Sequence, residues 1–186
     1  TIERMGNGLL LLVNQLLDIS KIRSAIGDPD WRHGDVTARM RIVTMMYHSY
    51  AGDRGVGLSF EAREAVVMDY VPDYVDKVLN NLLSNSFKFT PEGGKVAVRV
   101  WREGDRLMLD VSDTGVGMDN ETAAKVFEPF FQGEGDSSNI GTGVGLALVK
   151  QIVDNLKGRI TVESAVGKGT TFHLSVPIIN GHCSVA

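Results

Sequence analysis

The chain has 186 residues, of which 43% are hydrophobic and 23% are charged, and its formal net charge at pH 7 is −4. This length accommodates one main domain of about 100 to 200 residues together with an appended element. The composition is typical of globular proteins and argues against a disordered or fibrous chain. The sequence has no dense run of Lys or Arg, which argues against a nucleic acid as a partner.

The single cysteine, Cys183, excludes an intrachain disulfide and indicates a reducing compartment. The longest apolar run, Leu9–Val13, is far shorter than the roughly 20 residues that cross a bilayer. The sequence starts at Thr1 rather than at a methionine, so we expect a fragment whose parent carries any membrane anchor outside it. The four histidines and Cys183 do not show the spacing of metal ligands.

The first predicted element is an amphipathic helix over Ile2–Ile26. Its apolar residues recur at heptad spacing in two rows, Ile2, Leu9 and Leu16 in one and Met5, Leu12, Ile19 and Ile26 in the other. Leu10, Val13 and Leu17 widen this stripe, which is typical of a helix packed in a bundle. Gly27–Asp30 ends the helix, because Gly caps a helix end and Pro does not continue one.

The rest of the chain alternates short strands and helices. Asp35 is placed to cap the helix after it, and Pro72 is tolerated in the first turn of the next one. The predicted helices are Val36–Tyr50, Tyr74–Phe89, Glu121–Phe127 and Val144–Leu156. The predicted strands are Gly57–Phe60, Ala65–Asp69, Lys95–Trp101, Leu107–Ser112, Arg159–Glu163 and Thr170–Val176. Because the helices and the hairpin-type strands segregate, this pattern predicts an α+β sandwich with helices on one face of one sheet.

A polar line crosses the predicted helix before Pro91. Asn81, Asn85 and Lys88 are four and three residues apart, so they share one narrow face of an otherwise apolar helix. An amide carbonyl is a hard oxygen ligand suited to Mg²⁺, and a lysine one turn further on can neutralise phosphate. Taken alone, such a line is more common on a solvated helix face.

Three glycine-rich segments follow, and each has a structural interpretation of its own. Asp113–Met118 places a carboxylate and two glycines after a strand, which also fits an ordinary turn. Gly141–Leu146 opens a helix, where exposed N–H groups bind anions, although helix starts are often rich in glycine. Gly167–Phe172 suits a hairpin turn without any ligand.

The order and spacing of these four segments resemble the N, G1, G2 and G3 boxes of the histidine-kinase catalytic domain. Val126–Phe131 resembles the F box, and Leu11–Arg23 resembles the second dimerisation helix of these kinases. The resemblance implies the Bergerat fold, a two-layer α/β sandwich with a mixed, mostly antiparallel sheet, preceded here by one long helix. We expect residues 1–27 to be the second helix of an incomplete dimerisation and phosphotransfer hairpin, residues 28–180 to be the catalytic ATP-binding domain and residues 181–186 to be a tail.

The resemblance also implies ATP and Mg²⁺ as cofactors. Asp113 then accepts a hydrogen bond from the adenine amino group, and Asn85 ligates Mg²⁺. Asn81 lies beside the phosphates and Lys88 is a phosphate cation, which gives these two residues the catalytic roles. Phe89 lies near the sugar. The other nucleotide-binding residues that it implies are Gly115, Gly117, Met118, Phe127, Gly141, Thr142, Gly143, Val144, Gly145, Leu146 and Thr170.

The lid over the nucleotide is expected to run from Asp119 to Thr142 and to be mobile without nucleotide. Many members of the family have an arginine after the F box, where this chain has Gln132. A neutral amide does not supply the charge of an arginine in phosphoryl transfer. Nucleotide binding is therefore a firmer expectation than fast catalysis.

None of the histidines has the sequence context of the family's phosphoacceptor, so we expect that acceptor on a first dimerisation helix before Thr1. We expect this chain to bind ATP without phosphorylating itself. The implied partners are the histidine-bearing dimerisation helix and a response regulator receiver domain, in a homodimeric parent. This chain would be the cytoplasmic portion of a membrane-anchored sensor. The histidines concerned are His33, His48, His173 and His182.

Two other functions are compatible with parts of this pattern. One is an ATPase of the gyrase or mismatch-repair type, which depends on a following domain that supplies a lysine to the γ-phosphate. The other is a nucleotide-free dimerisation or scaffolding module that keeps the glycine segments for structural reasons. The presence of Asn85, Lys88 and Asp113 together argues against the second function.

Overall fold

The computed structural model describes residues 2–24, 29–133 and 143–183. The helices of these residues are α1 (Ile2–Ser24), α2 (Val36–Met45), α3 (His48–Asp53), α4 (Pro72–Phe89), α5 (Asn120–Lys125) and α6 (Gly145–Asn155). The strands are β1 (Arg32–Asp35), β2 (Gly57–Ala62), β3 (Val67–Tyr70), β4 (Lys95–Glu103), β5 (Arg106–Asp113), β6 (Arg159–Ala165) and β7 (Gly169–Pro177). The predicted α+β class is confirmed.

One prediction of secondary structure was wrong, and one strand was missed. The single helix predicted over Val36–Tyr50 is two helices, α2 and α3, separated by a turn at Met46 and Tyr47. The strand β1 was not predicted, and it pairs antiparallel with β3 in a separate two-stranded sheet. Asp35 caps α2 as expected, since its carboxylate accepts hydrogen bonds from the N–H groups of Thr37 and Ala38.

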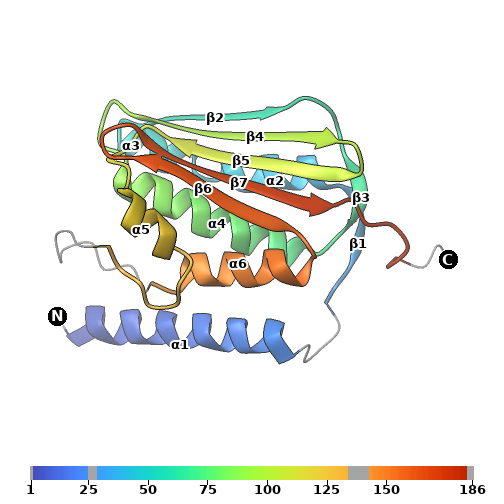
Figure 1. Ribbon diagram of the computed structural model, residues 1–186, viewed down its shortest axis with the longest axis horizontal. Coiled ribbons are helices and arrows are strands. Elements are labelled where there is room, and N and C mark those ends of the chain that lie inside the picture. Colours follow the sequence, from blue (N-terminus) through green and yellow to red (C-terminus); the bar gives the residue numbers. More distant parts are fainter. Residues whose placement is uncertain (1, 25–28, 134–142, 184–186) are drawn as a thin grey trace.

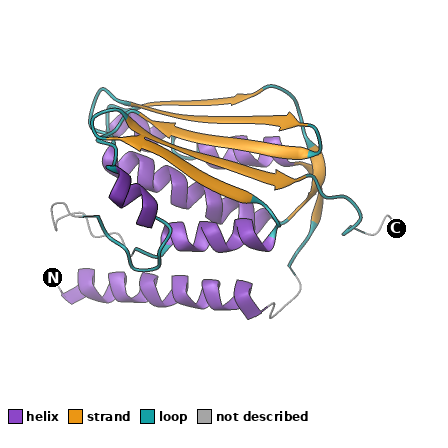
Figure 2. Ribbon diagram, viewed as in Figure 1, coloured by secondary structure: helices purple, strands orange, loops and turns teal. Residues whose placement is uncertain are grey.

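The main sheet of the described residues has five strands in the order β2-β4-β5-β7-β6. Only β2 and β4 pair in parallel, and the other neighbours are antiparallel, as expected for a mixed and mostly antiparallel sheet. Helices α2, α4 and α6 cover one face of the sheet, and α1 forms a further layer on α6 (Figures 1 and 2). This arrangement is the two-layer sandwich that the sequence predicted, with α1 added outside it.

The core lies between the sheet and the helix layer, and α4 supplies its centre. Fully buried side chains of α4 pack against those of β4, β5 and β7, including Leu79, Leu82, Leu83, Phe87, Val98, Val111 and Phe172. The predicted strands alternate buried and more exposed residues, as β5 does along its whole length. A strand with this pattern places every second residue toward the helices and leaves the others on the outer face.

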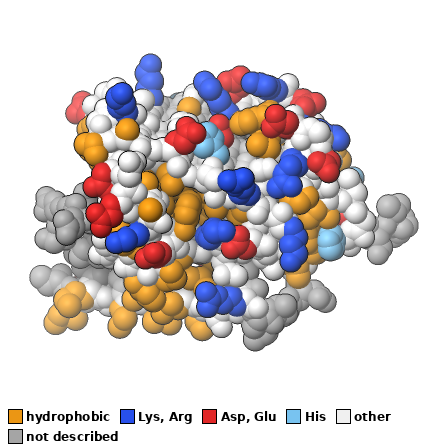
Figure 3. Space-filling view, in the orientation of Figure 1, with side chains coloured by type: hydrophobic (Ala, Val, Ile, Leu, Met, Phe, Trp, Pro, Cys, Tyr) orange, Lys and Arg blue, Asp and Glu red, His pale blue; other side chains and the backbone are white. Residues whose placement is uncertain are grey.

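Helix α1 is held against the domain by a few specific contacts. Ile19 packs against the core, Asp18 forms an ion pair with Lys77 at 3.4 Å, and Arg23 donates a hydrogen bond to Gln151 at 3.3 Å. Eight apolar side chains of α1 are exposed, and such side chains gather along the lower edge of the molecule (Figure 3): Ile2, Met5, Leu9, Leu10, Leu11, Val13, Leu16 and Leu17. No helix of the described residues is long and apolar enough to cross a membrane.

The segment after β7 is fixed by a buried carboxylate. Asp69 of β3 accepts hydrogen bonds from the backbone N–H groups of His182 and Cys183, and its other oxygen lies 2.6 Å from Nδ1 of His33. The His182 ring stacks on Trp31 with 4.0 Å between ring centroids. The predicted tail at 181–186 is thus docked through residue 183, and residues 184–186 lie outside the described residues.

Candidate nucleotide-binding site

The site is centred on Asp113, the last residue of β5. Its register partner on β7 is Thr170, which brings the G1 and G3 segments together. Asp113 is 8% exposed, and its Oδ1 accepts hydrogen bonds from the N–H of Gly115 at 2.9 Å and from the N–H of Thr170 at 3.3 Å. Its other oxygen, Oδ2, accepts no hydrogen bond from the described residues. A buried carboxylate with one oxygen left open can accept a hydrogen bond from a ligand.

Burial raises the pKa of the Asp113 carboxyl above its ordinary value. The hydrogen bonds from Gly115 and Thr170 and the nearby hydroxyl of Ser86 lower this pKa, but they do not cancel the effect of burial. No charged side chain of the described residues contributes to the shift. The carboxylate therefore depends on hydrogen-bond donors, and a donor from a ligand would add to them.

The loop after Asp113 packs on the C-terminal end of α4. The N–H of Val116 donates to the carbonyl of Phe89 at 3.1 Å, and Thr114 accepts from the N–H of Lys95 at 2.9 Å. Gly117 has a φ of +67°, and a Cβ at this position would overlap the carbonyl oxygen of Ala165. The glycine segment is therefore required for close packing between the G1 loop and the β6–β7 hairpin, whether or not a ligand is present.

A chain of hydroxyl groups extends from Asp113 toward Met118. The hydroxyls of Thr170 and Ser164 lie 2.8 Å apart, and the Ser164 hydroxyl donates to the carbonyl of Gly169 at 3.0 Å. Because a hydroxyl has one proton, Thr170 is the donor in the pair that it forms with Ser164. Ser164 also accepts from the N–H of Met118 at 2.8 Å. The two predicted site residues Met118 and Thr170 are thus joined through Ser164, which sequence reasoning missed.

The polar line of α4 lies beside this loop. Asn81 donates from Nδ2 to the carbonyl of Lys77 at 2.6 Å, and Asn85 and Lys88 are half-buried. Burial lowers the pKa of the Lys88 ammonium, which lies 5.2 Å from the centre of the Phe89 ring. A cation held near a half-exposed aromatic ring suits the neutralisation of phosphate next to a sugar.

The start of α6 faces the same polar line. A Cβ at Gly145 would overlap the amide oxygen of Asn81, so glycine permits the close approach of α6 to α4. The residue before the helix, Val144, is buried, and no side chain of the described residues caps the first turn of α6. The N–H groups of this turn are therefore left without a side-chain acceptor, which suits a bound anion. Gly143 and Leu146 flank this turn, whereas the predicted Gly141 and Thr142 lie outside the described residues.

Phe127 takes part in core packing. Its ring meets the ring of Phe172 edge to face, with 6.0 Å between centroids. This contact orders the start of the predicted lid together with α5, whose N-cap is Asp119. Gln132 is exposed at the end of this part, and the remaining lid residues, 134–142, lie outside the described residues. The predicted mobility of the lid stays a prediction.

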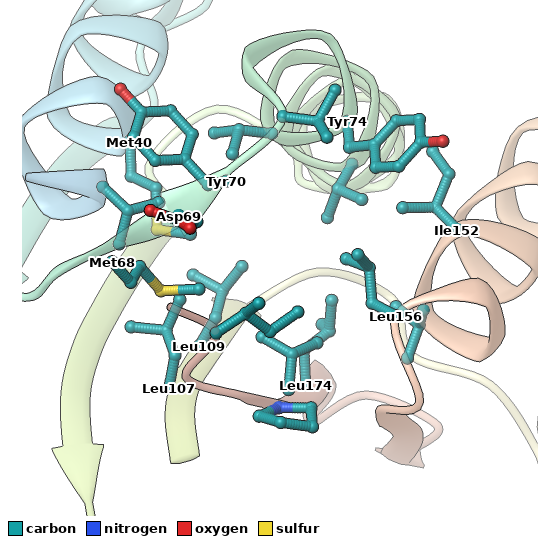
Figure 4. Close-up of a pocket in the computed structure, with 18 of the residues that line it drawn as sticks. Met40, Met68, Asp69, Tyr70, Tyr74, Leu107, Leu109, Ile152, Leu156 and Leu174 are labelled. Atoms are coloured by element: carbon teal, nitrogen blue, oxygen red, sulfur yellow. The ribbon is translucent and has the colours of Figure 1, made fainter. Parts of the chain in front are cut away.

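A separate apolar cavity of about 70 Å³ lies between the helix layer and the sheet (Figure 4). It is bounded by α4, α6 and the ends of β3, β5 and β7, with Tyr74, Leu109, Ile152, Leu156 and Leu174 among its lining residues. None of the nucleotide-site residues predicted from the sequence lines it. The cavity is therefore distinct from the site around Asp113.

The fold and the arrangement of these segments agree with the family to which the chain belongs. Its residues 70–180 match the family of histidine kinase-, DNA gyrase B- and HSP90-like ATPases. Within that family the chain is similar to the circadian input-output histidine kinase CikA of Synechococcus elongatus, with 37% identity over 181 residues. That match covers 95% of this chain and 24% of CikA.

Solved structures show the same relationship. Full-length ShkA in complex with AMPPNP superposes with a TM-score of 0.83 at 25% identity, over 97% of this chain and 38% of ShkA. The histidine kinase ThkA, in complex with the response regulator TrrA, shares the fold with a TM-score of 0.76 at 21% identity, over 95% of this chain and 49% of that chain. The chain is thus an ATP-binding domain of the histidine-kinase type, and it spans less than half of the relatives described here.

Proposed function

We propose that this domain binds Mg²⁺-ATP between α4, the G1 loop and the start of α6, and that it phosphorylates a histidine of its parent kinase. The observation that carries the proposal is the buried carboxylate of Asp113, whose Oδ2 has no donor among the described residues while Oδ1 accepts two hydrogen bonds. An acceptor in this position favours the amino group of adenine over the carbonyl oxygen of guanine.

The other site residues are arranged for the rest of the nucleotide. Asn85 is the candidate ligand of Mg²⁺, because it presents a half-buried amide oxygen one turn from Lys88. Lys88 and the uncapped start of α6 would bind the phosphates from two sides. Asn81, between them, would contact the phosphates from α4.

In the proposed reaction, the imidazole of the acceptor histidine attacks the γ-phosphorus, a P–N bond forms, and the bond to the ADP oxygen breaks. Three of the four histidines of this chain make structural contacts: His33 with Asp69, His173 with Asp110, and His182 with Trp31. The fourth, His48, is exposed on α3. We propose that the acceptor instead lies on a dimerisation helix of the parent kinase. A response regulator receiver domain would then take the phosphoryl group, in a homodimeric, membrane-anchored parent whose cytoplasmic part includes this domain.

Calorimetry with ATP tests the adenine assignment. Asp113→Asn should weaken binding by about 1.5–3 kcal/mol, since a hydrogen bond to a charged group has that strength. Asp110→Asn is the matched control, because Asp110 is on the same strand and contacts His173 on the outer face of the sheet. Equal ATP affinity of the two variants would contradict the assignment. Asn85→Ala should instead flatten the dependence of affinity on magnesium concentration.

Incubation with γ-labelled ATP tests the phosphoryl transfer. Acid-labile label should be absent from this chain alone and should occur on an added protein that carries both dimerisation helices of the parent. The Asn85→Ala variant should abolish that label. Acid-labile label on this chain alone would show that one of its own histidines is the acceptor.

A further inference from the structure

Ser86 of α4 has an unusual position for a serine in a helix. It is 0% exposed, and its hydroxyl has no hydrogen-bond partner among the described residues. Buried hydroxyls in helices commonly bond to a carbonyl one turn earlier. In this protein the hydroxyl of Thr44 donates to the backbone carbonyl of Met40 at 2.8 Å, and the hydroxyl of Thr90 donates to the backbone carbonyl of Ser86 at 2.7 Å. The Ser86 hydroxyl is thus an unsatisfied donor in a protein that satisfies comparable ones.

The hydroxyl of Ser86 lies close enough to the carboxyl of Asp113 to lower the pKa of that carboxyl. It lowers this pKa together with the N–H groups of Gly115 and Thr170, although its geometry falls short of a hydrogen bond. These two N–H groups both go to Oδ1. A small rotation of the carboxyl or of the serine would complete a hydrogen bond from Ser86 and would fix the plane of the carboxylate.

Leaving a buried hydroxyl unsatisfied carries a free-energy cost, so the presence of Ser86 at the base of the site calls for a partner in another state of the protein. The candidate partner is the Asp113 carboxylate when a ligand donor binds to it. An alanine would fill nearly the same space without this cost.

We propose that Ser86 is a positioning residue for adenine, and that its hydroxyl donates to Asp113 and orients that carboxylate toward the 6-amino group of ATP. The inference rests on the proposed function, because it assumes that Asp113 binds adenine. Ser86 does not touch the reacting atoms. It acts through Asp113, on the selectivity and the pH dependence of nucleotide binding.

The test is calorimetry of Ser86→Ala with ATP and with purine riboside triphosphate, which lacks the 6-amino group. We expect ATP affinity to fall about tenfold, the usual effect of one hydrogen bond to a charged group, and the affinity for the purine analogue to stay unchanged. Thr90→Val is the matched control. It removes a buried hydroxyl at the same end of α4, but this hydroxyl donates to the backbone carbonyl of Ser86 and not to Asp113. Its ATP affinity should match that of the wild type.

Two further readouts separate positioning from a general structural role. Stability in urea should be unchanged or higher for Ser86→Ala, because the substitution removes an unsatisfied donor. Since the Ser86 hydroxyl lowers the pKa of Asp113, its removal raises that pKa further, and ATP binding should be lost at a higher pH as the solution is acidified. The neighbours that act on this carboxyl are Ser86, Gly115 and Thr170, and none of them is charged.

The outcomes distinguish this inference from the proposed function. The role of Ser86 alone would be overturned if Asp113→Asn lost ATP affinity while Ser86→Ala bound ATP like the wild type and lost that binding at the same acidic pH. An equal loss for ATP and for the purine analogue in Ser86→Ala would also overturn it. Wild-type ATP affinity in Asp113→Asn would remove the proposed function and this inference together.

Discussion

The close approach of the G1 loop to the β6–β7 hairpin can be tested at Gly117. Its φ is +67°, and a Cβ would overlap the carbonyl oxygen of Ala165. Two hydrogen bonds hold the G1 loop against this hairpin. The N–H of Gly167 donates to the carbonyl of Val116 at 2.7 Å, and the N–H of Met118 donates to the hydroxyl of Ser164 at 2.8 Å. An alanine at 117 cannot be accommodated without moving one of these two backbones.

The magnitude follows from two contributions. An alanine in the left-handed region costs about 1–2 kcal/mol, and loss of the two hydrogen bonds adds about 1 kcal/mol each. Gly117→Ala should therefore destabilise the domain by about 3–4 kcal/mol. Gly104→Ala is the matched control, because Gly104 has a φ of +61° and open space at its Cβ. This control retains only the backbone contribution of about 1–2 kcal/mol.

Urea denaturation measures the stability of both variants, and a fluorescent ATP analogue measures their affinity. Gly117→Ala should lose nucleotide affinity even where it is folded, because the displaced loop carries Asp113 and Met118 with it. Gly104→Ala lies in the β4–β5 turn and should bind like the wild type. Equal stability and equal affinity of the two variants would refute the argument from close packing.

Three other predictions concern the core, the outer face and the phosphate side of the site. Phe87→Ala should cost about 3–5 kcal/mol in urea denaturation because Phe87 is fully buried, whereas Val67→Ala, at a 54% exposed position, should stay within about 0.5 kcal/mol. Burial lowers the pKa of His173, but Asp110 and Glu163 outweigh burial and raise this pKa above its ordinary value. The stabilisation of the fold by protonated His173 is therefore complete below the pKa of the unfolded state and is lost as pH rises through the pKa of the folded state. The stability difference between wild type and His173→Gln should thus be larger at pH 5 than at pH 9. Lys88→Met should weaken ATP binding and leave adenosine binding unchanged in calorimetry.

The parts of the fold that the sequence predicted are those with strong local periodicity. Helix α4 has an apolar face interrupted by one polar line, and β5 alternates along its length, so both were predicted within a few residues of their bounds. The missed strand β1 has the sequence Arg-His-Gly-Asp, which shows no alternation and forms a strand only because β3 pairs with it. The turn between α2 and α3 contains neither Gly nor Pro, so no local signal indicated a break.

The site was predictable where it depends on motifs and not where it depends on packing. Asp113 and Thr170 were both predicted, but only the strand register shows that they are partners. Ser164 could have been found from the predicted hairpin turn, since it pairs with Thr170 across that turn. Ser86 gave no sequence signal of its own, because its effect depends on a carboxylate that lies 27 residues further along the chain and is brought to it by the sheet.

The two buried aspartates of the domain show why structure adds what sequence lacks. Asp69 and Asp113 are both almost inaccessible and both belong to strands. The N–H of Cys183, the His33 ring and the N–H of His182 satisfy both oxygens of Asp69 and lower its pKa to about 2, so this carboxylate is saturated and holds the C-terminal segment in place. Asp113 has its donors on one oxygen and a raised pKa, because burial outweighs them. A carboxylate buried with an unfilled acceptor is more stable with a bound donor than without one, so the same residue type has a structural role at 69 and is the proposed ligand-binding group at 113.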